Sequence, residues 1–374
     1  MSMSLYIHIP FCRKKCVYCD FYSVKYDRNL VCAYVDVLCR QIEVLDDNFS
    51  TVFIGGGTPT VLDVRLLKKI LIKLHRVSKD VSEFTIEVNP ESFTREKADL
   101  LISEGVNRIS IGGQSLYDKK LRRLGRVHSV NDVDRAVTIA VSAGFKNINL
   151  DLIFGVWGQN LDMWKKELNR AVRYPITHIS VYALTIETNT PLDIAVKRKQ
   201  IIPLSEDITA NMYGVAMEYL KKKGFYQYEV SNYSKKGYEC KHNLSYWNYN
   251  EYIGLGPSAV SFKGGVREKN VNNLENYIKN LGNKKGVVDS TESLSPVALA
   301  KEFAAIKIRT KDGINFGDFR ERFGLDFLTL ESEALTELYR EKLLKYRMKN
   351  KVKIGLYLTK RGFLFCDTVS SSFV

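Results

Sequence analysis

The sequence predicts an α/β fold, with a parallel sheet built from βαβ units and a smaller α+β module at the C-terminal end. Short runs of β-branched and aromatic residues alternate with longer amphipathic stretches from residue 4 to about residue 228. After Gly224 this alternation stops. Repeated βαβ units form either a doubly wound sheet or a barrel, and both collect ligands at the carboxyl ends of their strands.

Six strands and five helices are expected in the alternating part. The strand candidates are residues 5–9, 51–54, 84–88, 108–111, 147–153 and 178–184. The helix candidates between them are residues 30–45, 64–77, 95–104, 133–143 and 161–172. Polar or glycine-rich groups follow five successive strand candidates, and one functional face explains this better than five unrelated turns.

The rest of the chain is expected to divide into a connection and a module. Residues 266–295 are polar and predict a connection, which separates a first domain at 1–265 from a module at 296–374. Helical patterns are found in the module at 297–307, 316–323 and 330–345, and a hairpin is expected from 353–358 with 363–366. Helices followed by a hairpin resemble a winged helix, which binds DNA in some proteins and serves as a packing module in others.

The composition is that of a folded, basic protein. The 374 residues include 56 Lys and Arg against 42 Asp and Glu, and 45% are hydrophobic, which excludes a disordered or fibrous chain. With no run of about 18 apolar residues and no secretory signal at the start, a cytoplasmic location is expected. The net charge of +14 suits nucleic acid, a membrane surface or an anionic small molecule, but the lysines lie in short groups typical of solvated faces.

Three of the seven cysteines, Cys12, Cys16 and Cys19, have the spacing C-x3-C-x2-C. Three thiolates from one loop can each hold one iron of a cubane cluster, which leaves the fourth iron open to a small molecule. A zinc site is the alternative, but zinc requires four ligands and the fourth candidate, His8, lies within a predicted strand.

A glycine loop, Gly55-Gly56-Gly57-Thr58-Pro59, follows the second predicted strand. It lacks the G-K-[ST] ending of a phosphate-binding loop, which disfavours nucleotide triphosphates. Glycines let backbone groups approach a ligand closely, and a plain tight turn is the alternative.

The cysteine loop after the first strand resembles that of the radical S-adenosylmethionine (radical SAM) superfamily. The resemblance implies a partial (β/α)6 barrel, a 4Fe-4S cluster on Cys12, Cys16 and Cys19, and S-adenosylmethionine (SAM) chelating the open iron. Electron transfer to the sulfonium then yields methionine and a 5'-deoxyadenosyl radical. It further implies that Tyr18 touches adenine and that the glycine loop binds the methionine ammonium.

Further segments resemble the oxygen-independent coproporphyrinogen III oxidase branch of this superfamily, in the same order and at similar intervals. They are residues 6–12, 55–60, 87–90, 113–115 and 149–155. This resemblance implies cofactor contacts at Tyr6, Gly56, Gly57, Thr58, Glu87, Gln114, Arg126 and Asp151. The chemistry agrees, because an arginine pairs with a carboxylate and the acidic and amide groups accept from ribose hydroxyls or an ammonium.

Two departures from the oxidase pattern favour its close relatives, the HemW-type haem chaperones. Phe21 stands where the oxidase has a further cysteine, and only eleven residues precede Cys12 where the oxidase has a long extension. Residues 242–247 also fit the H-N-x-x-Y-W pattern of those chaperones. A neutral His242 is a suitable axial ligand for haem iron beside stacking aromatic residues, and Cys240 is a competing thiolate ligand.

The interpretation is a radical SAM protein that binds haem and delivers it to an acceptor haem protein. The alternatives are oxygen-independent decarboxylation of coproporphyrinogen III, which we expect to be absent, and radical modification of RNA, which lacks a recognisable RNA-binding module. No nucleic-acid partner is expected. The sequence leaves open a peripheral membrane contact, a homodimer, and whether SAM cleavage belongs to the function.

Overall fold

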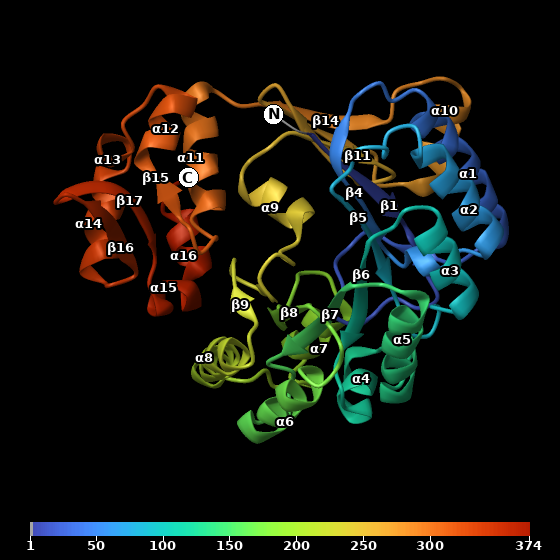
Figure 1. Ribbon diagram of the computed structural model, residues 1–374, viewed down its shortest axis with the longest axis horizontal. Helices are drawn as coiled ribbons and strands as arrows, with labels where there is room; N and C mark the ends of the chain where they lie inside the picture. Colours follow the sequence, from blue (N-terminus) through green and yellow to red (C-terminus); the bar gives the residue numbers. More distant parts are fainter. Residues whose placement is uncertain (1–2) are drawn as a thin grey trace.

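A single large sheet forms the body of the protein in the computed structural model, which describes residues 3–374. Its twelve strands follow the order β14-β13-β12-β11-β1-β4-β5-β6-β7-β8-β10-β9. From β11 to β8 the strands are parallel, and beyond them on both sides they are antiparallel. A smaller module lies at one end of the long axis (Figure 1).

Six parallel strands succeed one another in chain order, which is the winding of an open barrel and not of a doubly wound sheet. They are β1 (Met3–Ile9), β4 (Phe49–Gly56), β5 (Glu83–Val88), β6 (Arg108–Gln114), β7 (Asn147–Phe154) and β8 (His178–Ala183). The helices that follow them are α1 (Arg28–Glu43), α2 (Val64–Leu74), α3 (Arg95–Ser103), α4 (Asp118–Leu124), α5 (Val130–Ala143), α6 (Leu161–Ala171), α7 (Pro191–Lys197) and α8 (Glu206–Lys222). The predicted partial (β/α)6 barrel is confirmed.

The alternation of side chains along each strand separates an apolar outer layer from a polar interior. On β6, Ile109 and Ile111 are buried in the hydrophobic core, whereas Arg108 and Ser110 line a cavity inside the barrel. This two-residue period is what a strand requires when its two faces meet different environments. Polar groups are thereby directed toward the site.

The segment at 266–295, expected to be a connection, contains regular structure. After β9 (Tyr226–Gln227), β10 (Asn232–Ser234) and α9 (Lys241–Trp247), the sheet continues through β11 (Tyr252–Leu255), β12 (Val260–Lys263), β13 (Val266–Asn270) and β14 (Val288–Ser293), with α10 (Leu274–Gly282) inserted before β14. β14 is an edge strand with every residue exposed, so its polar sequence is indistinguishable from that of a loop.

The C-terminal module has helices and a three-stranded sheet in a winged-helix-like order. Its elements are α11 (Pro296–Lys307), β15 (Ile314–Asn315), α12 (Phe316–Phe323), α13 (Phe327–Leu330), α14 (Ser332–Arg340), β16 (Leu344–Lys349), β17 (Val352–Leu358), α15 (Lys360–Leu364) and α16 (Cys366–Ser371). The prediction that residues 353–358 pair with 363–366 around Arg361 and Gly362 is wrong. The hairpin turns at Asn350 and Lys351, both at positive φ, and Thr359 caps a helix where the second strand was expected.

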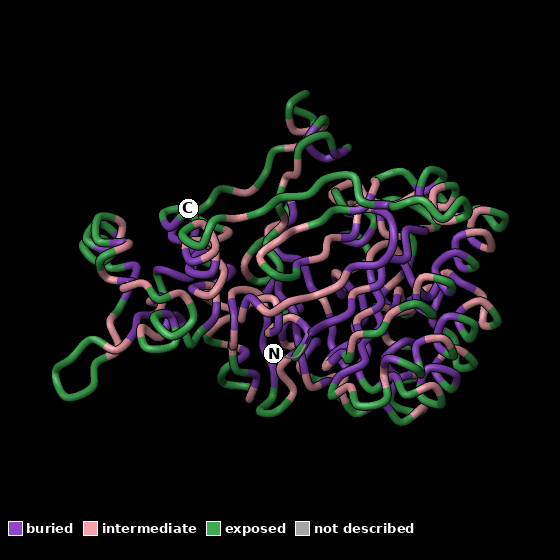
Figure 2. The backbone as a smooth tube through the Cα atoms, turned by 90° about the horizontal axis from the view of Figure 1, so that it is seen from above, coloured by how far each residue is buried: buried purple, intermediate pink, exposed green. Residues whose placement is uncertain are grey.

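Two short strands and a 3-10 turn shape the loops above the barrel. β2 (Phe11–Cys12) pairs with β3 (Val24–Lys25), and Pro59–Val61 forms the turn after the glycine loop. Exposed backbone is concentrated at the outer helices and at the tip of the C-terminal module (Figure 2). Among residues 3–374 no helix is long and apolar enough to cross a membrane.

Candidate cofactor site and aromatic cavity

The cysteine loop closes one side of a cavity of about 440 Å³ at the carboxyl ends of the barrel strands. Pairing of β2 with β3 holds both ends of the loop, and the Cys19 amide donates to the Cys16 carbonyl at 3.3 Å to form a turn. Cys12, Cys16 and Cys19 all line the cavity and are partly exposed to it. The structure therefore gathers the three predicted ligands at one opening.

The environment of the thiols suits a cluster. Cys16 Sγ accepts from Arg126 Nη1 at 3.5 Å, and Cys12 Sγ lies 3.7 Å from Thr58 Oγ1. Burial raises the pKa of Cys12, and raises that of Cys19 to about 11, so metal binding must displace their protons. Residues 3–374 contain no group of His, Cys, Asp and Glu that could hold a single metal ion. A cubane cluster does not require three ligands around one ion, because each thiolate bonds a different iron.

The glycine loop packs directly against β1. Gly56 has a φ of +107°, and a Cβ there would lie 2.5 Å from the His8 ring. At Gly57 a Cβ would lie 2.8 Å from the Phe11 carbonyl oxygen. The glycines are thus required by the approach of the loop to the first strand, and Thr58 is left facing the cavity.

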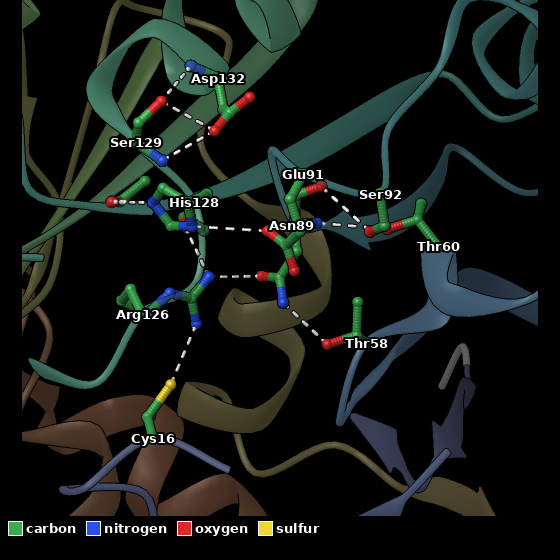
Figure 3. A network of polar contacts seen from close by, with 12 residues as sticks. Cys16, Thr58, Thr60, Asn89, Glu91, Ser92, Arg126, His128, Ser129 and Asp132 are labelled. Carbon is green, nitrogen blue, oxygen red and sulfur yellow. Dashed lines mark hydrogen bonds and ion pairs between the residues drawn. The ribbon is translucent and has the colours of Figure 1, made fainter. Parts of the chain in front are cut away.

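Arg126 joins three strand ends into one network (Figure 3). Its Nη2 donates to Asn89 Oδ1 at 2.7 Å and to the Gly112 carbonyl at 2.9 Å. Asn89 Nδ2 donates in turn to Thr58 Oγ1 at 2.8 Å. Asn89 was missed as a site residue, because an asparagine before a proline is also ordinary turn chemistry.

Two buried acids, Glu87 and Asp151, lie inside the same cavity. Glu87 Oε2 accepts from the Gly56 amide at 3.1 Å, and Asp151 accepts from Ser110 Oγ and Asn149 Nδ2. Burial, followed by the charge of Asp151, raises the pKa of Glu87 to about 8. Burial also raises the pKa of Asp151. At neutral pH a proton is therefore held on Glu87.

The remaining predicted cofactor contacts divide between two places. Tyr18 and Gln114 line the cofactor cavity, and Gln114 has an unusual φ of 60°. Tyr6 differs from the expectation, because it lines a neighbouring cavity and its hydroxyl bonds His8 Nδ1 at 3.0 Å. Along β1 Tyr6 alternates with the core residues Leu5 and Ile7, which directs it toward that neighbouring space.

The neighbouring cavity, of about 500 Å³, is predominantly aromatic. We call it the aromatic cavity, and its lining includes Tyr6, His8, Phe21, Tyr22, Phe53, His242, Tyr246, Trp247, Tyr249, Tyr252, Phe262, Arg267 and Ile306. α9 supplies the predicted H-N-x-x-Y-W segment to one wall. The last two members of the lining come from β13 and α11, so the module takes part as well.

His242 is held by hydrogen bonds at both ring nitrogens. Thr51 Oγ1 donates to Ser4 Oγ, so the 2.8 Å contact between Thr51 and His242 Nδ1 places the ring proton on Nδ1. Nε2 therefore carries the lone pair and accepts from Tyr246 Oη at 3.0 Å. Burial lowers the pKa of His242 to about 3, which keeps the imidazole neutral.

Cys240, the competing thiolate candidate, is placed differently. Its side chain is fully buried, and Sγ donates to Glu83 Oε1 at 3.3 Å. Burial raises the pKa of this thiol. His8 is a further candidate ligand for haem iron, which the sequence did not suggest. Its Nε2 donates to the Tyr22 carbonyl at 2.8 Å, which leaves the lone pair on Nδ1.

Together the barrel, the cysteine loop and the polar cavity define a radical SAM protein. The family model for the radical SAM superfamily matches residues 6–171. The solved structure of Escherichia coli coproporphyrinogen III oxidase (HemN), a radical SAM enzyme, shares the fold. Its TM-score is 0.85 at 21% identity, covering 100% of this chain and 90% of that one.

Relatives named heme chaperone HemW are similar over almost the full length. The protein from Lactococcus lactis is 33% identical, covering 99% of this chain and 97% of its own. The Bacillus subtilis protein is 34% identical and covers 99% of both chains, and that of Mycobacterium tuberculosis is 33% identical over 98% and 93%. The chain belongs to the HemW family within the radical SAM superfamily.

Proposed function

We propose that this protein binds haem in the aromatic cavity and passes it to acceptor haem proteins. The observation that carries the proposal is an aromatic cavity lined by a neutral histidine whose Nε2 carries the lone pair and accepts from the Tyr246 hydroxyl. A volume of about 500 Å³ lies within the ordinary range of ligand pockets. The relatives named heme chaperone HemW support the same function.

His242 is the proposed axial ligand. A metal-bound histidine usually donates its other ring nitrogen to a fixed acceptor, and the Nδ1–H bond to Thr51 is such an arrangement. Tyr246 now donates to Nε2, so its hydroxyl must turn away when iron binds. Cys240 is not among the residues that line the aromatic cavity, which favours His242 over the thiolate alternative.

The proposal includes a 4Fe-4S cluster on Cys12, Cys16 and Cys19 with SAM beside it. Such a cluster, when bound, supplies an electron for cleavage of SAM. Arg126 would orient a carboxylate of the cofactor, since its guanidinium is fixed by Asn89 and the Gly112 carbonyl. Glu87 and Asp151 would accept from ribose hydroxyls or the ammonium, and Tyr18 would contact adenine.

One experiment tests the haem site. Anaerobically reconstituted protein is titrated with haem, and His242→Ala should shift the Soret spectrum and weaken haem retention while the iron–sulfur absorbance remains. His75→Ala, at a half-exposed histidine that bonds Glu104, is the matched control. An unaltered Soret spectrum in His242→Ala would remove His242 as the ligand, and Cys240→Ala and His8→Ala would then identify the replacement.

The alternative function, oxygen-independent oxidation of coproporphyrinogen III, is tested with the same preparation. Supplied with SAM, reductant and coproporphyrinogen III, the protein should bind little of this substrate and form no vinyl product. Product formed at turnovers per minute, which is within the usual enzymatic range, would overturn the chaperone proposal.

A further inference from the structure

The positive charge of the chain is concentrated on one hairpin. Residues 340–361, which we call the basic hairpin, comprise β16, β17 and their flanks, and they contain nine Lys and Arg against a single acidic residue, Glu341. This segment supplies +8 of the net +14. The sequence indicated short lysine groups scattered over solvated faces. In the fold, β16 and β17 bring the cations of residues 340–361 together on one hairpin.

Most of these cations form no ion pair with the part of the chain that the structure describes. Lys345, Lys349 and Lys351 are exposed, and across residues 3–374 none of them forms an ion pair. Within the basic hairpin only Lys360 does so, with the exposed Glu218. Like charges gathered on one surface repel each other, so such a cluster is stabilised when an anionic surface approaches.

The tip of the hairpin combines this charge with exposed apolar side chains. Met348 is 52% exposed and Val352 is 62% exposed, and they lie on the two strands just before and after the turn. The turn projects from the end of the long axis, away from the barrel (Figures 1 and 2). Exposed apolar side chains surrounded by lysines suit the boundary between lipid headgroups and acyl chains.

The neighbouring helix argues against a nucleic acid. In a winged-helix protein the helix before the wing enters the major groove, and α14 occupies that position. The exposed residues Glu333 and Glu337 of α14 and its C-cap Glu341 are spaced by four and form an acidic stripe. The acidic stripe would repel the phosphates along a groove. Phosphates would also make no apolar contact with Met348 and Val352.

We propose that the basic hairpin docks on anionic lipid surfaces, with its lysines against headgroup phosphates and its apolar tip in the interface. The docking does not depend on haem binding, because the hairpin contributes no residue to the aromatic cavity. Each lysine near an anionic bilayer contributes about 1 kcal/mol, so three of them account for roughly a hundredfold in affinity.

The test is co-sedimentation of the full chain with vesicles of equal parts phosphatidylglycerol and phosphatidylcholine. We expect salt-sensitive binding to these vesicles and little to phosphatidylcholine alone. Lys345→Gln/Lys349→Gln/Lys351→Gln should weaken binding about a hundredfold. Lys221→Gln/Lys222→Gln/Lys223→Gln, a matched triple at the exposed end of α8, should leave it nearly unchanged.

A second variant separates the apolar tip from the charge. Met348→Ser/Val352→Ser should weaken vesicle binding about tenfold while its salt dependence stays the same, because two apolar side chains that would enter the lipid interface are lost. Equal binding by both hairpin variants and the parent, or no binding to anionic vesicles at all, would overturn the proposal. Tighter binding to duplex DNA than to vesicles at the same salt, lost in the lysine triple, would also overturn it and identify a nucleic-acid surface.

Discussion

The cofactor cavity and the aromatic cavity meet at Phe21, Phe53 and Asn243, yet they are built in opposite ways. Thiols, acids and amides at the ends of consecutive strands line the cofactor cavity. All of its lining residues except Asn243 lie between Cys12 and Glu187. Rings from β1, β4, α9, β11 and β12, together with Ile306 of α11, line the aromatic cavity, and these segments lie far apart in the sequence.

This difference separates two kinds of recognition. A charged, flexible cofactor needs hydrogen bonds in fixed directions, and the ends of parallel strands supply them from a rigid frame. A flat apolar macrocycle needs aromatic area and one ligand, which a strand extension and a packed module can add at the side of the barrel. The two cavities should therefore respond independently to substitution, and the following predictions test that independence.

The largest effect is expected from Cys12→Ala/Cys16→Ala/Cys19→Ala. Iron and sulfide analysis should show complete loss of the cluster, because no other cysteines in the chain have comparable spacing. Haem titration should stay within a few-fold of the parent, since none of the three lines the aromatic cavity. Cys32→Ala is the control. Iron and sulfide that survive the triple change would refute the cluster assignment, and loss of haem binding would refute the independence.

SAM affinity should fall about ten- to hundredfold in Arg126→Ala and in Asp151→Ala, because a charge-assisted contact contributes about 1.5–3 kcal/mol. Calorimetric titration of the reconstituted protein measures it. The cluster and haem binding should both persist, and the exposed Arg122→Ala should behave as the parent. Unchanged SAM binding in both variants would show that the pocket lies elsewhere.

Tyr246→Phe should tighten haem binding about fivefold. The substitution removes the hydroxyl that donates to His242 Nε2, so iron no longer displaces a hydrogen bond worth about 1 kcal/mol. Tyr252→Phe is the matched control, because Tyr252 packs edge-on against Tyr246 in the same cavity without touching the imidazole. Weaker binding in Tyr246→Phe, or a Soret spectrum unlike that of the parent, would indicate a different ligand.

The sequence predicted the barrel well because its strands are short runs of alternating apolar and polar residues separated by capped amphipathic helices. Ser129 and Asp132 form a capping box at α5, and Asp27 and Asp63 cap α1 and α2, so these helices begin where local chemistry requires. The sequence also predicted that the cysteines, Glu87, Gln114, Arg126 and Asp151 share one opening. Parallel strands make this inference reliable, since their carboxyl ends meet at one edge.

The remaining features depend on tertiary contacts that no local pattern encodes. Tyr6 lines the aromatic cavity and not the cofactor cavity, and its contact with His8 shows which space it enters. β14 is entirely exposed, and the hairpin turn at Asn350 and Lys351 lacks glycine and proline, so both resemble loops or helix ends. The bond of Thr51 to His242 links residues 191 positions apart.

The last expected effect is on stability and not on binding, and it concerns Glu87, whose folded-state pKa is raised to about 8 by burial and then by Asp151. Below pH 4.5 the carboxyl is protonated in both folded and unfolded chains and has no effect on stability. Between pH 4.5 and 8 the unfolded chain ionises while the folded one keeps its proton, so stability falls as pH rises. The loss is at most about 1.4 kcal/mol per pH unit, and above the folded pKa it stops growing.

Glu87→Gln removes this dependence, so the variant should gain stability over the parent as pH rises from 5 to 8. Urea unfolding of both proteins without cofactor, at four pH values in that window, measures the difference. Asp151→Asn should reduce the dependence, because the charge of Asp151 contributes to the raised pKa of Glu87, whereas the exposed Glu96→Gln is the control. His242 acts in the opposite sense, because the unfolded chain protonates this histidine below its ordinary pKa of 6.5 while the folded chain keeps it neutral with a pKa of about 3. Its contribution to stability therefore rises with pH between 5 and 6.5, and His242→Ala should remove that rise. A gain that is equal at every pH would mean that Glu87 is ionised in the folded protein, and the cofactor cavity would then be wetter than its burial indicates.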